Sequence, residues 1–512
     1  MRRKKSLYNI ASSLASYFVT MIFAFITQAL IVKILGIEYS GINGLFTNIL
    51  TMLSVAELGI GTAIIYKLYE PLSKNNKEEI KSWMNFYKIC YRFVAAFVVI
   101  IGLVLLPLIP TIVGNTYIKE NLYILYLISL LDVAFSYIMT YKRSLLYADQ
   151  KSYIINIIHI GYVIFMNLCQ VMVIYFTKNY LIFLMVKVIY RIMENLLINL
   201  YVNKNYAYIK EPSTKISKKE KNDIVERIKA IFIQKVSFVV NKGIDNITIS
   251  IFLGVASVGL YTNYNLIATT LCGIIFQMIS GFTASIGNLL TESNKKKNYV
   301  IYKTITLSNT FLTTICISGF ICCIDTFMKI WLGSKYILPI SIIISFAIYI
   351  YSDSIRRSIT IYKEAAGICK EDKYVYILMA IINLTTSIIL CKIIGISGVI
   401  IGTSLSYIFL IFYSYPKYIY KKVFDVSITN YYKEKIKSII LIIISCIIGY
   451  TICYYIGNKC ILDLIIRGFI SILIPTVIYI ISYRNSDELK YIKDKINFNK
   501  IKLRWIKWKM MS

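Results

Sequence analysis

Residues 2–35 read RRKKSLYNIASSLASYFVTMIFAFITQALIVKIL. Four consecutive basic residues precede an apolar run that extends from residue 8 to residue 35. A helix needs about 20 residues to cross ~30 Å of hydrocarbon, so this run predicts a membrane-spanning helix. The run is longer than the apolar core of a signal peptide, and no small-residue cleavage site follows it. We therefore expect it to remain in the protein.

The same pattern of apolar runs separated by polar segments continues along the chain. The composition is 57% hydrophobic, with a mean hydropathy of +0.65 over 512 residues, which is typical of a membrane protein. The sequence predicts an all-α, polytopic membrane protein with about 14 transmembrane helices. The predicted spans are 8–35, 41–66, 93–113, 122–140, 153–176, 180–200, 230–253, 260–290, 304–324, 337–355, 376–394, 399–415, 439–455 and 461–483.

Basic residues are concentrated in every second gap between these spans. Together with the two terminal segments, alternate gaps hold 45 of the 57 Lys and Arg residues, whereas the remaining gaps hold five. Cytoplasmic loops of membrane proteins carry such an excess, so both termini are predicted to be cytoplasmic. The net charge of +31 is then best explained by contact with anionic membrane lipids, and no nucleic-acid partner is expected.

The chain contains an apparent internal repeat. Residues 35–42 read LGIEYSGI and residues 253–260 read LGVASVGL, so both joints between successive spans have the form Leu-Gly-x4-Gly. The separation of the two joints along the chain predicts two six-helix lobes related by a pseudo-twofold repeat, plus two extra C-terminal helices. The predicted divisions are an N-lobe at 1–203, a basic cytoplasmic linker at 204–229, a C-lobe at 230–422, extra helices at 423–483 and a basic amphipathic cytoplasmic tail at 484–512.

Polar and charged residues inside spans are the candidate functional residues, because each charge is costly in lipid unless it faces a cavity or a partner. Those on spans six and seven share helix faces and could line a cationic central cavity. The alternative is that neighbours such as Arg191 and Glu194 pair with each other. The candidates for substrate binding are Lys187, Arg191, Lys235, Lys242 and Asn246. The candidates for ion coupling are Glu57, Asp132, Asp245 and Asp353.

Beyond the first Leu-Gly-x4-Gly joint, residues 57–63 read ELGIGTA and residues 68–73 read LYEPLS. These motifs resemble Wzx-type lipid-linked oligosaccharide flippases of the multidrug/oligosaccharidyl-lipid/polysaccharide exporter superfamily. The resemblance implies a two-lobe bundle that carries an undecaprenyl-diphosphate-linked oligosaccharide from the inner to the outer leaflet by alternating access. It also implies a cationic lumen and a functionally sensitive acidic residue in the second span, here Glu57.

This interpretation implies a transporter rather than an enzyme, without catalytic residues or a cofactor, and with coupling to H+, Na+ or the membrane potential. Polysaccharide polymerases and glycosyltransferases are the expected protein partners. A metal site is not expected, because His159 is the single histidine and the 11 cysteines form no C-x-x-C pair. The alternatives are an ion-coupled multidrug or metabolite antiporter of the same superfamily and, less favoured, a membrane-embedded polysaccharide polymerase or glycosyltransferase.

Overall fold

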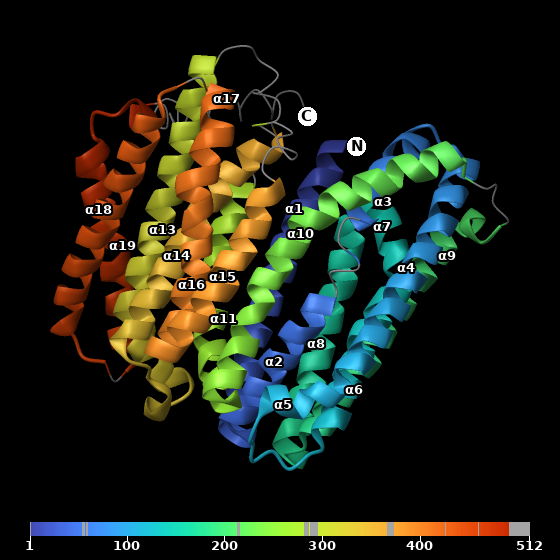
Figure 1. The fold of residues 1–512 in the computed structure, drawn as a ribbon, viewed down its shortest axis with the longest axis horizontal. Coiled ribbons are helices and arrows are strands. Elements are labelled where there is room, and N and C mark those ends of the chain that lie inside the picture. Colours follow the sequence, from blue (N-terminus) through green and yellow to red (C-terminus); the bar gives the residue numbers. More distant parts are fainter. Residues whose placement is uncertain are drawn as a thin grey trace, which may run out of the picture. The chain divides into compact units, whose positions relative to one another are not determined.

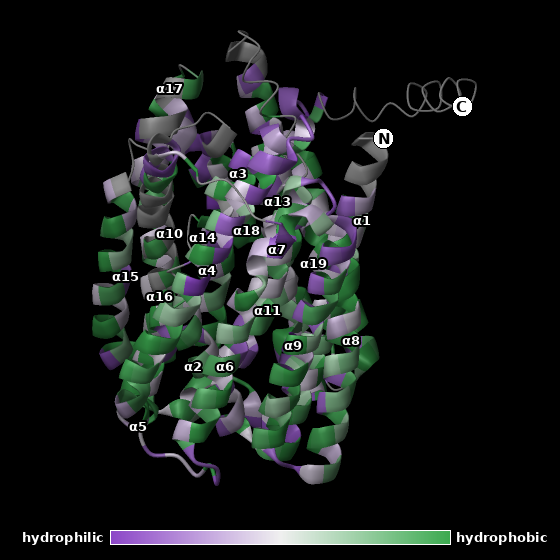
Figure 2. Ribbon diagram, turned by 90° about the vertical axis from the view of Figure 1, so that its right-hand side faces the viewer, coloured by the Kyte–Doolittle hydropathy of each residue, from purple (hydrophilic) through white to green (hydrophobic). Residues whose placement is uncertain are grey.

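The computed structural model describes residues 2–53, 57, 60–211, 216–280, 286, 295–365, 373–424, 426–458 and 460–490. Each of the fourteen predicted spans is helical over most of its described part (Figure 1), and the described residues form no strands. Apolar residues cover most of the helical length and hydrophilic residues gather towards the helix ends (Figure 2). The prediction of an all-α membrane protein is therefore confirmed.

Residue contacts divide the chain into two units. Unit 1 contains residues 1–266 and 376–403, and unit 2 contains residues 267–375 and 404–512. The boundaries fall inside three helices, α11 (Val255–Ser280), α15 (Lys373–Ile394) and α16 (Ile396–Phe409), and not in the segment 204–229. The lobe divisions drawn from the sequence stay a prediction.

The remaining α-helices of unit 1 are α1 (Arg2–Leu30), α2 (Ile37–Leu53), α3 (Ile60–Ser73), α4 (Lys77–Leu105), α5 (Ile109–Val113), α6 (Leu122–Ile138), α7 (Thr140–Ala148), α8 (Ser152–Thr177), α9 (Tyr180–Asn205), α10 (Lys218–Leu253) and α15 (Lys373–Ile394), whose first three residues lie in unit 2. Those of unit 2 are α13 (Lys295–Trp331), α14 (Ile340–Ala365), α17 (Lys421–Phe424), α18 (Ile428–Tyr454) and α19 (Ile461–Tyr483).

Eight described helical segments are long and apolar enough to cross a membrane by themselves. The pair α6 and α7 adds a ninth, bent by 42° at the break between Ile138 and Thr140. Charged residues inside α9 and α14 interrupt their apolar stretches. The helix starts follow ordinary capping chemistry: the side chains of Asn76, Asn121 and Asn179 accept backbone N–H groups at the starts of α4, α6 and α9.

The two Leu-Gly-x4-Gly joints contact each other within unit 1. Gly36 and Gly254 have φ of +115° and +82°, a backbone region that glycine adopts without strain. A Cβ atom on Gly41 would lie 2.1 Å from the carbonyl oxygen of Val255, and one on Gly259 would lie 2.2 Å from that of Ile37. Ile37 and Val255 occupy equivalent places in the two joints. This reciprocal contact explains both second glycines and agrees with a pseudo-twofold repeat.

Candidate functional site

Charged side chains from four helices of unit 1 meet in one cluster. Lys187, Arg191 and Glu194 are spaced by four and three residues on α9, which places them on one helix face. Neighbouring helices each add one side chain to this face. We call the set the α6–α9 charge cluster, and its members are Asp132 from α6, Arg143 from α7, His159 from α8, and Lys187, Arg191 and Glu194 from α9.

Glu194 lies at one end of the cluster and its side chain has no exposed surface. Its Oε2 atom lies 3.0 Å from Nη1 of Arg191 and 3.0 Å from Nη2 of Arg143. Its Oε1 atom lies 2.9 Å from Nδ1 of His159. A buried carboxylate loses its hydration, so these three contacts are what keeps its charge tolerable there.

Asp132 lies at the other end and is also buried. Its two oxygens lie 3.1 Å from Nζ of Lys187 and 3.1 Å from Nε of Arg191. Arg191 therefore bridges both carboxylates, and its guanidinium carbon lies 4.9 Å from the ring centre of Tyr162. Three Lys and Arg cations face two carboxylates, so these five residues together have a net charge of +1. The side chain of Lys187 is 33% exposed, which makes it the more accessible of the two α9 cations.

The cluster combines three residues that the sequence singled out, Asp132, Lys187 and Arg191. It also shows the Arg191–Glu194 pair that the sequence offered as the alternative to cavity lining. Sequence reasoning missed Arg143 and His159 as functional candidates. Arg143 was counted among the loop residues, because the bend that starts α7 continues a helix beyond the predicted span. His159 is the single histidine in the chain, and this was the only feature of the sequence that could have marked it as a functional candidate.

Glu57 lies between α2 and α3 and is half-buried. The hydroxyl of Tyr91 on α4 donates a 2.6 Å hydrogen bond to its Oε1 atom. Tyr91 is buried and packs edge-on against Tyr87, with the ring centres 5.0 Å apart. In the described part of the chain this carboxylate forms no ion pair, so it differs from the carboxylates of the α6–α9 charge cluster.

Asp245 and Asn246 are buried on α10. Asp245 accepts hydrogen bonds from Thr403 at 2.7 Å and from Tyr261 at 3.2 Å. Among the described residues, nothing pairs with the Oδ1 atom of Asn246. For Lys235 and Lys242, also on α10, the backbone is described but the side chains are not. The predicted roles of these two lysines stay predictions.

Asp353 belongs to unit 2 and forms a compact cluster within α14. It is buried and pairs with Arg356, and it accepts a 2.8 Å hydrogen bond from Nε of Arg357. The guanidinium of Arg356 lies 4.5 Å from the ring centre of Tyr407. Asp353 is therefore a neutralised carboxylate in this structure.

The described residues contain no group of three or more His, Cys, Asp or Glu side chains that could hold a metal ion. The candidate residues form instead buried ion pairs, two carboxylates that accept hydrogen bonds from tyrosines, and accessible cations. Such groups can bind an anion or exchange a proton.

Comparisons with known proteins fit these features. Residues 30–341 match the model of a family described as polysaccharide biosynthesis protein. The fold is similar to that of the lipid II flippase MurJ in an inward closed conformation, with a TM-score of 0.67 at 16% identity over 93% of this chain and 99% of MurJ. No curated protein matches the sequence.

Transporters of the MATE family share the fold to a lesser degree. An inward-facing multidrug resistance MATE family transporter of the MOP superfamily gives a TM-score of 0.59 at 13% identity, over 78% of this chain and 96% of that one. A mutant of the MATE transporter VcmN of Vibrio cholerae gives 0.55 at 13% identity, over 79% of this chain and 93% of that one. The resemblance stated from the sequence is thereby confirmed at the level of family and fold.

Proposed function

The chain belongs to the polysaccharide biosynthesis protein family, and from this premise we propose that it is a flippase for an undecaprenyl-diphosphate-linked oligosaccharide. The observation that carries the proposal is the family match over residues 30–341. The fold similarity to a lipid II flippase supports a lipid-linked sugar as the cargo. The direction is from the inner to the outer leaflet of a bacterial cytoplasmic membrane, with both termini in the cytoplasm.

The physical task is to move a charged, hydrated headgroup past hydrocarbon. Unaided passage of a diphosphate is prohibitive, because isolated charges lose their hydration in an apolar medium. Alternating access solves this by shielding the headgroup in protein while the polyprenyl tail stays in lipid. No bond is made or broken, so transport requires binding groups alone.

Lys187 is the residue we assign to capture of the diphosphate. Its ammonium contacts one carboxylate, Asp132, at 3.1 Å, and a third of its side chain is exposed. Arg191 already bridges two carboxylates and fits a supporting role that fixes Asp132. We also propose Lys235, Lys242 and Asn246 for capture of the diphosphate, and this proposal is based only on their positions along α10.

Glu57 is the residue we assign to ion coupling. A carboxylate that binds and releases H+ or Na+ needs a site without a permanent cationic partner. Glu57 is held by a tyrosine hydroxyl, whereas Asp132 and Asp353 pair with Lys or Arg side chains. Asp245 is deeply buried between two hydroxyl donors and is the second candidate. Polysaccharide polymerases and glycosyltransferases are the proposed functional partners.

The test is translocation in vesicles that contain the purified full chain and a defined undecaprenyl-diphosphate oligosaccharide. Access of a membrane-impermeant lectin reports the sugar that reaches the opposite leaflet. Lys187→Gln should slow this by on the order of tenfold, equivalent to ~1.4 kcal/mol of lost interaction. Lys204→Gln, an exposed lysine on the same helix, is the matched control and should behave as the wild type. No translocation by the wild-type protein would refute the proposal.

A multidrug or metabolite antiporter is the second candidate. The fold similarity to a multidrug resistance MATE family transporter favours it. The same vesicles, loaded with an organic cation under a proton or sodium gradient, separate the two functions. Cation export without sugar translocation would establish the antiporter in place of the flippase.

A further inference from the structure

Lys435 on α18 is a buried lysine that forms no close ion pair in the described part of the chain, although the neighbouring carboxylate of Glu434 attracts it. Its relative exposure is 1%, and in the described part of the chain its ammonium forms neither an ion pair nor a hydrogen bond. The nearest aromatic group is the ring of Tyr431, whose centre lies 5.4 Å from Nζ. Lysine is almost never buried unless it is paired, because its desolvation costs several kcal/mol. An anion in contact with its ammonium would offset this cost.

Lys435 lines a polar cavity of about 170 Å³ between α13, α18 and the segment after α19. The other cations that line it are Lys303 and Lys437. Lys303 pairs with Glu488 at 2.6 Å, while Lys437 stacks on Tyr483 with its Nζ 3.8 Å from the ring centre. Burial of Glu488 opposes its ionisation, but the hydrogen bonds from Lys303, Ser486 and the backbone, with the positive charge of Lys303, together outweigh burial and lower the pKa of Glu488.

The charges of this cavity favour a ligand with a single negative charge. Three lysines face two carboxylates, Glu434 and Glu488, so the net charge is +1. Glu434 also accepts a 3.1 Å hydrogen bond from Tyr299. A monoanionic phosphodiester would be neutralised here, whereas the two carboxylates would repel the higher charge of a diphosphate.

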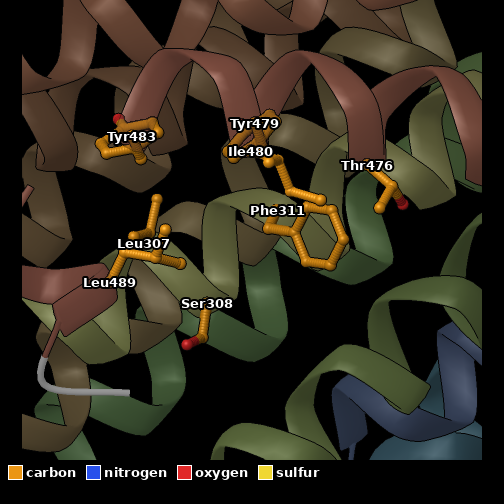
Figure 3. Close-up of a pocket in the computed structure, with 8 residues that line it drawn as sticks. All are labelled: Leu307, Ser308, Phe311, Thr476, Tyr479, Ile480, Tyr483 and Leu489. Carbon is orange, nitrogen blue, oxygen red and sulfur yellow. The ribbon is translucent and has the colours of Figure 1, made fainter. Parts of the chain in front are cut away.

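An apolar cavity of about 350 Å³ adjoins the polar one, since Leu307 and Tyr483 line both. Figure 3 shows the two sides of the apolar cavity, with Tyr479 and Ile480 on α19 facing Leu307 and Phe311 on α13. Both cavities lie within unit 2. A ligand that fills them has a charged end beside Lys435 and a hydrocarbon part between α13 and α19.

We propose that these joined cavities bind one anionic glycerophospholipid as a resident stabilising ligand. Its phosphodiester pairs with Lys435 and Lys437, and part of one acyl chain packs between α13 and α19. Lys303 and Lys437 belong to segments that the sequence predicts to be cytoplasmic, where anionic lipids are abundant. This site is separate from the α6–α9 charge cluster and its occupant is not the cargo of the proposed flippase.

The experiment measures thermal unfolding of the full chain, purified in detergent and stripped of lipid. Added dioleoyl phosphatidylglycerol should raise the unfolding midpoint by about 5 °C, because it binds the folded state alone. Dioleoyl phosphatidylcholine has the same acyl chains without net charge and should have little effect. Inorganic phosphate has the charge without chains and should also have little effect. Native mass spectrometry should show one retained phosphatidylglycerol.

Two substitutions locate the site. Lys435→Gln should abolish the phosphatidylglycerol shift, and Lys433→Gln, an exposed lysine on the same helix, should retain it. Ser308→Phe fills the apolar cavity and should abolish the shift with Lys435 intact, so the test survives if one variant fails to fold.

Four outcomes would overturn the proposal. They are an equal shift with phosphatidylcholine, an equal shift with inorganic phosphate, loss of the shift in Lys433→Gln, and displacement of phosphatidylglycerol by equimolar undecaprenyl diphosphate. The last outcome would make the cavities a cargo site.

Discussion

The α6–α9 charge cluster in unit 1 and the Lys435 cavity in unit 2 place cations inside membrane-spanning helices in opposite ways. In the cluster, every described Lys or Arg contacts a carboxylate of the same unit, and Arg191 contacts two. In the cavity, Lys303 forms an ion pair at 2.6 Å, whereas Lys435 forms no close ion pair in the described part of the chain. The first arrangement is complete by itself, and the second becomes complete when an anion binds.

This difference separates two uses of buried charge. Ion pairs within the protein fix the packing of α6, α7, α8 and α9, and removal of one member leaves its partners uncompensated. A cation without an internal partner destabilises the empty protein, and it couples stability to a ligand by mass action. The substitutions proposed below remove or add a charged or hydrogen-bonding partner in one of the two regions.

Removal of the Glu194 carboxylate, which two arginines share, should have the largest effect on the free energy of unfolding. Glu194→Gln keeps the size of the side chain but leaves Arg143 and Arg191 with less compensation. We expect a loss of about 3–5 kcal/mol in the free energy of unfolding, measured by thermal unfolding in detergent. Glu70→Gln, in an exposed pair with Lys74, is the control and should leave the midpoint unchanged. Wild-type stability of Glu194→Gln would show that the cluster does not depend on charge balance.

The sequence alone predicted the features of the two regions that depend on local residue patterns. Apolar runs and alternating basic gaps located the spans, and the Leu-Gly-x4-Gly joints identified positions that prove to be in reciprocal contact. The periodicity of α9 also placed Lys187, Arg191 and Glu194 on one face. These features depend on residues close together in the chain, and helix geometry alone connects them.

The missing parts depend on tertiary packing. Arg143 joins the cluster because the helix bends by 42° and continues as α7, and hydropathy does not report such a bend. Lys435 looked like a loop lysine because the apolar run begins at residue 439, whereas α18 begins at Ile428. Its burial arises from packing of α18 in a region shared with α13 and α19, which lie far from it in sequence.

Introduction of a carboxylate that can pair with Lys435 should have an intermediate effect on the free energy of unfolding. Ser438 lies three residues along α18 and lines the same cavity, and Ser438→Asp places a carboxylate within reach of Lys435. We expect the lipid-free protein to gain about 1–3 kcal/mol, the usual value of a hydrogen bond to a charged group, and to lose its response to phosphatidylglycerol. Ser438→Asn, similar in size but neutral, is the matched control. An undiminished lipid response in Ser438→Asp would contradict the role of Lys435 as the anion-binding group.

Removal of the imidazole of His159 from the cluster should have the smallest effect on the free energy of unfolding. His159→Phe preserves the ring that stacks on Tyr162, with ring centres 5.5 Å apart, but removes the 2.9 Å contact to Glu194. We expect a loss of about 1 kcal/mol in the free energy of unfolding, because Glu194 keeps both arginines. His159→Gln retains a hydrogen-bond donor and should lie closer to the wild type in the same measurement. A loss in His159→Phe as large as that in Glu194→Gln would mean that His159 carries a charge on which the cluster depends, and the balance between three cations and two carboxylates would then be wrong.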